Sequence, residues 1–260
     1  MKILLLRGLN TYGDDNMRLG WFNFGDWYTP METALKRKGF TVHSIRNMGF
    51  ESFESQATRA ENAILQFDPD SKERNLILLG HSTGGLIARI LAHQPQLTHR
   101  IHSIISLATP HKGTPAAQNA LDWVDSGNAR IKVFKIANYD LKQRKDVLKQ
   151  YSKDFMEQFN QTYTDLYGIN YQHVLFTSEP DGLSVPLYLL KKYKPGLLSS
   201  SDGLIPAESQ IYGDEIGRFS LDHFGSFGYF LQASKKRRNA GLREFQRLID
   251  RLTTHLQKSM

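Results

Sequence analysis

The most informative stretch of this 260-residue chain is Leu76-Ile77-Leu78-Leu79-Gly80-His81-Ser82-Thr83-Gly84. The four apolar residues predict a buried strand, and the residues after the Gly-x-Ser-x-Gly pattern show helical spacing. A serine on a tight strand-to-helix turn projects out of the sheet, with its hydroxyl exposed and helix amides behind it. Glycines at positions 80 and 84 leave room for such a turn. We therefore predict that Ser82 is a catalytic nucleophile.

Strand and helix patterns alternate on both sides of this turn. Apolar or alternating runs predict strands at residues 3–6, 40–45, 76–79, 101–107 and 172–177. One helix is expected to begin at Thr29, with Thr29 as its cap, and to end at Gly39. Another is expected to be capped by Ser52, and an amphipathic helix closes the chain. This alternation predicts an α/β fold with a mostly parallel, doubly wound sheet, in a single domain spanning residues 1–260.

The alternation breaks after Thr109. Residues 113–170 show helical patterns and no convincing strand, which predicts a helical cap inserted into the domain. The aromatic stripe over residues 153–167 favours helix packing, and an apolar underside that contacts a substrate is the alternative. Residues 178–200 contain several Pro and Gly residues around an apolar middle, which is typical of a lid or a pocket wall.

Composition excludes several classes of protein. Hydrophobic residues make up 40% of the chain and charged residues 23%, as in an ordinary globular protein. Because there is no cysteine, a disulfide framework and a thiolate metal site are excluded. The apolar run at the N-terminus meets Arg7 after four residues, too few for a signal peptide, and no run approaches a membrane span. We therefore expect a cytoplasmic protein.

The net charge of +7 does not by itself identify a binding partner. Basic residues cluster at 191–194 and 235–238. We expect both clusters to be solvated surface, and transient contact with an anionic membrane or an acidic substrate is the alternative. We find no nucleic-acid-binding motif in the sequence. The oligomeric state is left open.

A serine hydroxyl needs a base that removes its proton, usually a histidine that a carboxylate orients. With this kind of turn the chain order is serine, acid and then histidine. Of the nine histidines, only His223 and His255 follow the last predicted strand. Because His255 falls within the terminal helix, His223 is the predicted base.

The acid is expected on a loop between the late strands and His223. Asp202 fits best, because its Asp-Gly step forms a turn. Asp181 is the main alternative, since it follows the strand at 172–177 more closely. Three other acids also stay open: Asp214, Glu215 and Asp222. Asp222 is adjacent to the base, so we expect it to cap or orient the loop.

The oxyanion of an acyl-transfer reaction needs hydrogen-bond donors. With this turn one donor is the backbone N–H after the nucleophile, here that of Thr83, and the other follows an early strand. Leu9, just after the strand at 3–6, occupies that position. Both assignments concern the backbone, so no side-chain substitution deletes these donors.

Three segments carry a resemblance to a known family. They are Gly80-His81-Ser82-Thr83-Gly84-Gly85, Thr109-Pro110-His111-Lys112-Gly113-Thr114-Pro115, and Asp202-Gly203-Leu204-Ile205-Pro206 with His223 after it. Together they resemble bacterial triacylglycerol lipases and related esterases of the α/β-hydrolase fold, over roughly residues 1–115 and 200–225. The resemblance implies a serine ester hydrolase without a cofactor, with Ser82, Asp202 and His223 as its triad and Leu9 and Thr83 as oxyanion donors. It also implies that His111 is structural.

The chain departs from the family pattern at two places. The family usually has His-Gly before the oxyanion residue, whereas this chain has Arg7-Gly8. We expect Arg7 to pair with an acid, with attraction of an anionic head group as the alternative. Several of these lipases hold a structural calcium, but the usual Asn-Gln segment after the histidine is absent, so we predict no metal site.

The main hypothesis is therefore a lipase or carboxylesterase that acts on acyl esters or lipids through an acyl-enzyme. An acyltransferase or a phospholipase with the same triad is the second enzymatic hypothesis. The non-enzymatic alternative is a binding protein that has the hydrolase fold but does not catalyse a reaction.

Overall fold

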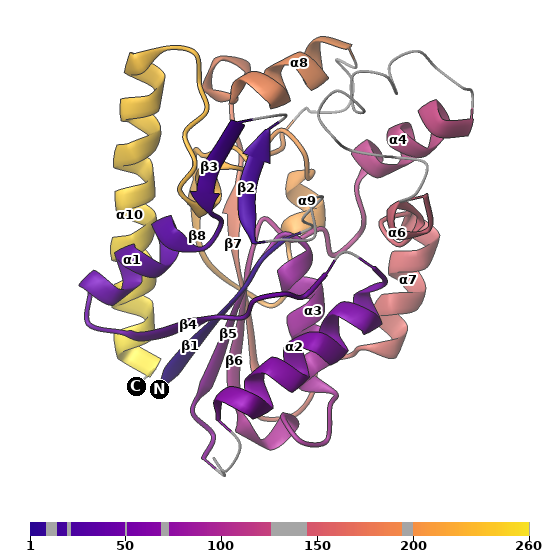
Figure 1. Ribbon diagram of the computed structural model, residues 1–260, viewed down its shortest axis with the longest axis vertical. Helices are drawn as coiled ribbons and strands as arrows, with labels where there is room; N and C mark the ends of the chain where they lie inside the picture. The colour runs from indigo at the N-terminus through magenta and orange to yellow at the C-terminus, as the bar shows by residue number, and fades with distance from the viewer. Residues whose placement is uncertain are drawn as a thin grey trace.

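The structure, a computed structural model, describes residues 1–8, 15–19, 22–49, 51–68, 73–125, 145–193 and 200–259. Within these residues the centre is a sheet of six strands in the order β4-β1-β5-β6-β7-β8 (Figure 1). The strands are β1 (Lys2–Leu6), β4 (Thr41–Ser44), β5 (Leu76–His81), β6 (Ile101–Leu107), β7 (Asn170–Phe176) and β8 (Asp214–Phe219). Each neighbouring pair is parallel, so the carboxyl ends of all these strands lie at one edge. The predicted α/β class is confirmed.

Both faces of the sheet are buried, as the continuous apolar runs require. In β1, Leu4 and Leu6 belong to one apolar cluster while Ile3 and Leu5 belong to the other. Figure 1 shows α1 (Thr29–Arg37) and α10 (Lys235–Ser259) on one side of the sheet. On the other side lie α2 (Phe53–Phe67) and α3 (Thr83–Ala92). The sheet is therefore a rigid platform whose carboxyl edge presents the loops.

Two helix starts test the expected caps. Ser52 caps α2 as expected, since its Oγ accepts a hydrogen bond from the Ser55 N–H at 3.2 Å. The cap prediction for Thr29 is wrong: Thr29 is already helical, the N-cap residue is Tyr28, and no side chain caps this end of α1. Pro30 fixes the helical backbone in the first turn, which makes a side-chain cap less necessary.

The expected helical patterns after Thr109 correspond to α4 (Pro115–Asp125), α6 (Lys145–Lys149) and α7 (Lys153–Thr162). The aromatic stripe packs as expected: Phe155 and Phe159 lie edge-on to Phe53 of α2. Residues 126–144 of the proposed cap lie outside the described residues.

The proposed lid segment, residues 178–200, contains a short 3-10 helix, η2 (Pro180–Gly182), and α8 (Val185–Tyr193). Residues 194–199 lie outside the described residues. The remaining elements are a two-stranded hairpin, β2 (Asn16–Leu19) and β3 (Phe22–Asp26), and η1 (Thr98–Arg100), α9 (Ala207–Gln210) and η4 (Gly225–Phe227). No helix in the described parts of the chain combines the length and hydropathy that a membrane span requires.

Candidate active site

Ser82 occupies the sharp turn between β5 and α3. Its backbone has φ 54° and ψ −125°, in a region that L-residues rarely adopt. Gly84 allows the turn, because a Cβ there would lie 2.2 Å from the Leu6 carbonyl oxygen. A Cβ on Gly80 would lie 2.4 Å from the backbone of Gly84. The pattern of glycines is thus a steric requirement, and the strained serine costs on the order of 1–3 kcal/mol that surrounding packing offsets.

The carboxyl ends of two neighbouring strands hold the Ser82 turn in place. The Ser82 N–H donates to the Leu107 carbonyl at the end of β6, at 2.8 Å. On the other side, a Cβ on Gly8 would lie 2.7 Å from Ser82 Cβ and 3.2 Å from its Oγ. Residue 8 therefore has to be small for the chain after β1 to pass the serine this closely. Ser82 itself is 8% exposed.

His223 and Asp202 form a buried pair. His223 Nδ1 lies 2.7 Å from Asp202 Oδ2, and the His223 N–H donates to the Asp202 carbonyl at 2.8 Å. The other carboxylate oxygen, Oδ1, accepts from the N–H groups of Leu204 and Ile205, at 2.9 and 2.7 Å. The two N–H groups and His223 Nδ1 thus converge on a carboxylate with no exposed surface. The Nδ1 atom of His223 is then the protonated one, and Nε2 is left to accept a proton.

The ring of His81 links the serine turn to this pair. It lies 4.9 Å from the His223 ring, and its Nε2 lies 3.1 Å from the His223 carbonyl and 3.0 Å from Ser226 Oγ. Burial and then the neighbouring His223 hold the pKa of His81 well below its ordinary 6.5. A neutral His81 whose Nε2–H donates to that carbonyl keeps His223 beside the turn.

Ser82 Oγ and the His223 ring, both among the described residues, are not joined by a hydrogen bond. Catalytic hydrogen bonds are often long in a substrate-free site and shorten when substrate binds. The structure therefore brings Asp202 and His223 into contact, and Ser82 directly follows His81, whose ring lies against that of His223.

The two predicted oxyanion donors have different outcomes. Thr83 is the first residue of α3, a position where the backbone N–H has no partner within the helix. Its side chain is buried, with Oγ1 2.5 Å from the hydroxyl of Tyr151. Leu9 lies outside the described residues, so its assignment stays a prediction.

The alternative acids have other partners. Asp181 lies in η2, where its exposed carboxylate pairs with Arg237. Asp222 is buried and accepts hydrogen bonds from the N–H groups of Ser184 and Gly225, at 2.6 and 2.7 Å. Burial raises the pKa of the Asp222 carboxyl. As expected, Asp222 orients the loop that carries His223. Asp214 and Glu215 lie in β8.

His111 has the structural surroundings that the family resemblance implies. Its backbone N–H donates to the Ser209 carbonyl at 2.8 Å, and its ring stacks on Tyr212 with the centroids 4.6 Å apart. Burial and the adjacent Arg89 guanidinium hold the pKa of His111 well below 6.5. His111 thus joins the loop after β6 to α9.

Arg7 pairs with an acid, as we expected. Its Nε lies 2.8 Å from Asp15 Oδ1, and only 1% of its side chain is exposed. Its Nη1 also donates to the Gly8 carbonyl at 3.1 Å. The charge introduced by this departure from the family pattern is therefore neutralised inside the protein.

The sequence analysis missed three supporting side chains. His81 is in a variable position of the Gly-x-Ser-x-Gly motif, so the motif gave no reason to select it. The ring centroids of Trp27 and His81 lie 5.8 Å apart. The hydroxyl of Tyr151 contacts Thr83, although the two residues are 68 positions apart in the chain. These contacts depend on the tertiary arrangement, and local spacing contains no signal for them.

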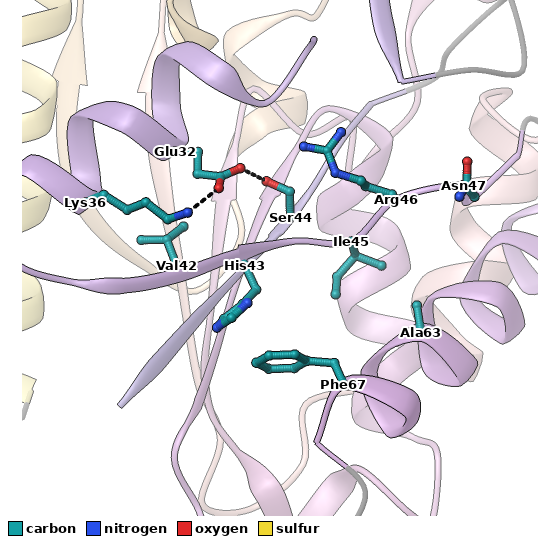
Figure 2. Close-up of a pocket in the computed structure, with 10 residues that line it drawn as sticks. All are labelled: Glu32, Lys36, Val42, His43, Ser44, Ile45, Arg46, Asn47, Ala63 and Phe67. Atoms are coloured by element: carbon teal, nitrogen blue, oxygen red, sulfur yellow. Dashed lines mark hydrogen bonds and ion pairs between the residues drawn. The ribbon is translucent and has the colours of Figure 1, made fainter.

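A separate groove of about 370 Å³ runs along β4, at the edge of the sheet (Figure 2). Its charged groups are paired: Lys36 and Ser44 both contact the Glu32 carboxylate, and Arg46 pairs with Asp26. Over the described ranges, no group of three or more His, Asp or Glu side chains has the arrangement of a metal site. The expectation of no metal stays a prediction, because residues outside these ranges also carry acids.

The chain is similar to known proteins in sequence and in structure. Residues 49–172 match the family model described as PGAP1-like alpha/beta domain, a range that includes Ser82 and ends before Asp202. A GPI inositol-deacylase of Candida albicans is 46% identical over 54 residues, which are 21% of this chain and 14% of the deacylase. Triacylglycerol lipase 2 of Saccharomyces cerevisiae is 24% identical over 210 residues, 76% of this chain and 61% of the lipase. The chain thus spans less than two thirds of either relative.

A solved structure is similar over almost the whole chain. The Staphylococcus hyicus lipase superposes with a TM-score of 0.67 at 12% identity, covering 99% of this chain and 95% of that one. The resemblance to lipases and esterases, expected from three short segments, is confirmed. The chain has the α/β-hydrolase fold of lipases and esterases, and its residues 49–172 match the PGAP1-like alpha/beta domain family.

Proposed function

We propose that this protein is a carboxylic ester hydrolase that acts on acyl esters through Ser82, His223 and Asp202. The main observation in support is the buried hydrogen bond of 2.7 Å between His223 Nδ1 and Asp202 Oδ2, next to a serine with φ 54°. The similarity to a triacylglycerol lipase and to a GPI inositol-deacylase supports ester chemistry.

The reaction follows from the placement of these groups. Ser82 Oγ attacks the ester carbonyl carbon while its proton moves to His223 Nε2. The negative oxygen of the tetrahedral intermediate accepts a hydrogen bond from the Thr83 N–H, and the Leu9 N–H is the proposed second donor. His223 then gives its proton to the departing alcohol oxygen, which leaves the acyl group on Ser82.

The second half of the reaction uses the same groups in reverse. His223 removes a proton from water, the water oxygen attacks the acyl carbon, and Ser82 Oγ leaves with the proton that His223 returns. Asp202 keeps its charge throughout and stabilises the imidazolium that forms in each half. Transfer of the acyl group to an alcohol instead of water would give the acyltransferase that the sequence left open.

The test is hydrolysis of p-nitrophenyl butyrate and p-nitrophenyl palmitate by the wild type and by Ser82→Ala. We expect hydrolysis by the wild type and only background rates from the variant. Ser55→Ala, an exposed serine on α2, is the matched control and should keep wild-type rates. The ratio of the two esters distinguishes a carboxylesterase from a lipase. A Ser82→Ala variant that keeps wild-type activity would exclude this mechanism.

A further inference from the structure

The fold brings an exposed apolar helix face and a basic cluster to the same end of the molecule. The apolar face belongs to α8, where Val185, Tyr188 and Leu189 are 42%, 50% and 46% exposed. These residues are three and four positions apart, so they lie on one side of the helix. The buried side of α8 carries Leu187, which is 4% exposed and lies against Gly203, next to Asp202.

The basic cluster is the first turn of α10, residues 235–238. Lys235 and Lys236 are exposed, and no carboxylate of the described residues forms an ion pair with either. Arg237 is neutralised by Asp181. The first turn of α10 contains no acidic residue. Cations at a helix N-terminus oppose the helix dipole, so the placement of Lys235 and Lys236 does not stabilise α10.

Direct hydrogen bonds connect these two features. The Val185 N–H donates to the Leu231 carbonyl at 3.0 Å, and Gln232 Nε2 donates to the Gly182 carbonyl at 3.1 Å. Figure 1 shows α8 and the first turns of α10 at the end of the molecule where the strands have their carboxyl ends. The start of α8 is also anchored beside the site, since the Ser184 N–H donates to Asp222.

We propose that α8 and the first turn of α10 form a docking surface for an anionic lipid bilayer. Val185, Tyr188 and Leu189 insert among the lipid chains near the headgroups, while Lys235 and Lys236 bind the anionic headgroups. The chemistry fits a bilayer because apolar and cationic groups lie at the same end of the molecule, as they do in interfacial helices. Docking in this orientation holds the carboxyl edge of the sheet, and thus the proposed site, near the lipid.

The charge of the surface sets the expected size of the effect. A lysine close to an anionic bilayer contributes a binding factor of about fivefold, so replacing both Lys235 and Lys236 should weaken binding about 25-fold. Added salt should weaken wild-type binding in the same direction, because exposed charges are screened. Removing the apolar face should weaken binding even at low salt.

The experiment is co-sedimentation of the whole chain with vesicles of phosphatidylcholine alone and of phosphatidylcholine with phosphatidylglycerol. We expect the wild type to bind the vesicles with phosphatidylglycerol, and Lys235→Gln/Lys236→Gln and Val185→Ser/Tyr188→Ser/Leu189→Ser to lose most of that binding. Two controls should bind as the wild type does. Arg37→Gln/Lys258→Gln removes the same charge at the far ends of α1 and α10, and Tyr167→Ser removes an exposed aromatic residue before β7.

The proposal would be overturned by equal binding of the wild type to both kinds of vesicle, by no binding of the wild type, or by variants that bind like their controls. A thermal melt confirms that each variant is folded. The measurement needs no turnover, and Ser82→Ala should bind like the wild type. Intact vesicle binding by a wild-type protein that hydrolyses no ester would therefore refute the proposed function alone.

Discussion

Replacing Asp202 by asparagine tests the orientation of His223. In the wild type, Oδ1 accepts from the Leu204 and Ile205 N–H groups, and Oδ2 lies 2.7 Å from His223 Nδ1. An asparagine keeps its carbonyl oxygen at the position with two N–H donors, so its NH₂ group faces His223. Two donors cannot share that contact. His223 therefore adopts the tautomer with its proton on Nε2, which can no longer accept the proton of Ser82.

We expect this change of tautomer to lower kcat about 10⁴-fold, as the same exchange does in another serine hydrolase. This loss corresponds to about 5.4 kcal/mol of transition-state stabilisation. The assay is the steady-state hydrolysis of p-nitrophenyl butyrate, with circular dichroism to show that the fold is kept. Asp181→Asn is the matched control, because Asp181 is exposed and pairs with Arg237. Near-normal activity in Asp202→Asn, together with a large loss in Asp181→Asn, would refute the assignment of the acid.

Three further predictions concern stability. His81 and His111 have a depressed pKa, so the folded protein takes up protons less readily than the unfolded chain below pH 6.5. The free energy of unfolding is therefore kept above that pH and falls below it, by about 1.4 kcal/mol per pH unit for each histidine. Urea unfolding at several pH values should show that the free energy of unfolding of His111→Gln falls less steeply with decreasing pH than that of the wild type. Arg7→Met, which removes the ion-pair partner of Asp15, should lower the free energy of unfolding by about 3–5 kcal/mol. Lys36→Met, at an exposed pair with Glu32, should lower it by less than about 1 kcal/mol, and similar losses in both variants would contradict the role of burial. Gly84→Ala should fail to fold or melt far below the wild type, because its Cβ would meet the Leu6 carbonyl at 2.2 Å, and a wild-type melting curve would show that the turn relaxes freely.

The sequence was a good guide where local rules decide the structure. The five predicted strands are all present. The buried strands β1 and β5 stand out as nearly continuous apolar runs, whereas β4, which is partly exposed, was predicted from alternation. The strand β8 was missed, since Asp214, Glu215 and Arg218 interrupt any apolar pattern in it. Among the described strands, β8 lies at the edge of the sheet with β7 as its single neighbour, so such residues are tolerated on its exposed side. The hairpin of β2 and β3 was missed as well.

For the site, chain order selected residues that the fold then brings together. Chain order narrowed the base to His223 and His255, and the Asp-Gly turn favoured Asp202 among the acids; Asp202 and His223 lie in direct contact. The supporting contacts of His81 with Ser226 and of Thr83 with Tyr151 were not predictable. They join residues 145 and 68 positions apart, and only the packed sheet decides which side chains meet.

The most direct test of the central claim is covalent labelling with a fluorophosphonate probe, followed by peptide mapping. We predict one adduct per chain, located on Ser82, which disappears in Ser82→Ala and forms far more slowly in His223→Ala. An adduct on a different residue would contradict the account, and so would a protein that hydrolyses esters without being labelled at Ser82.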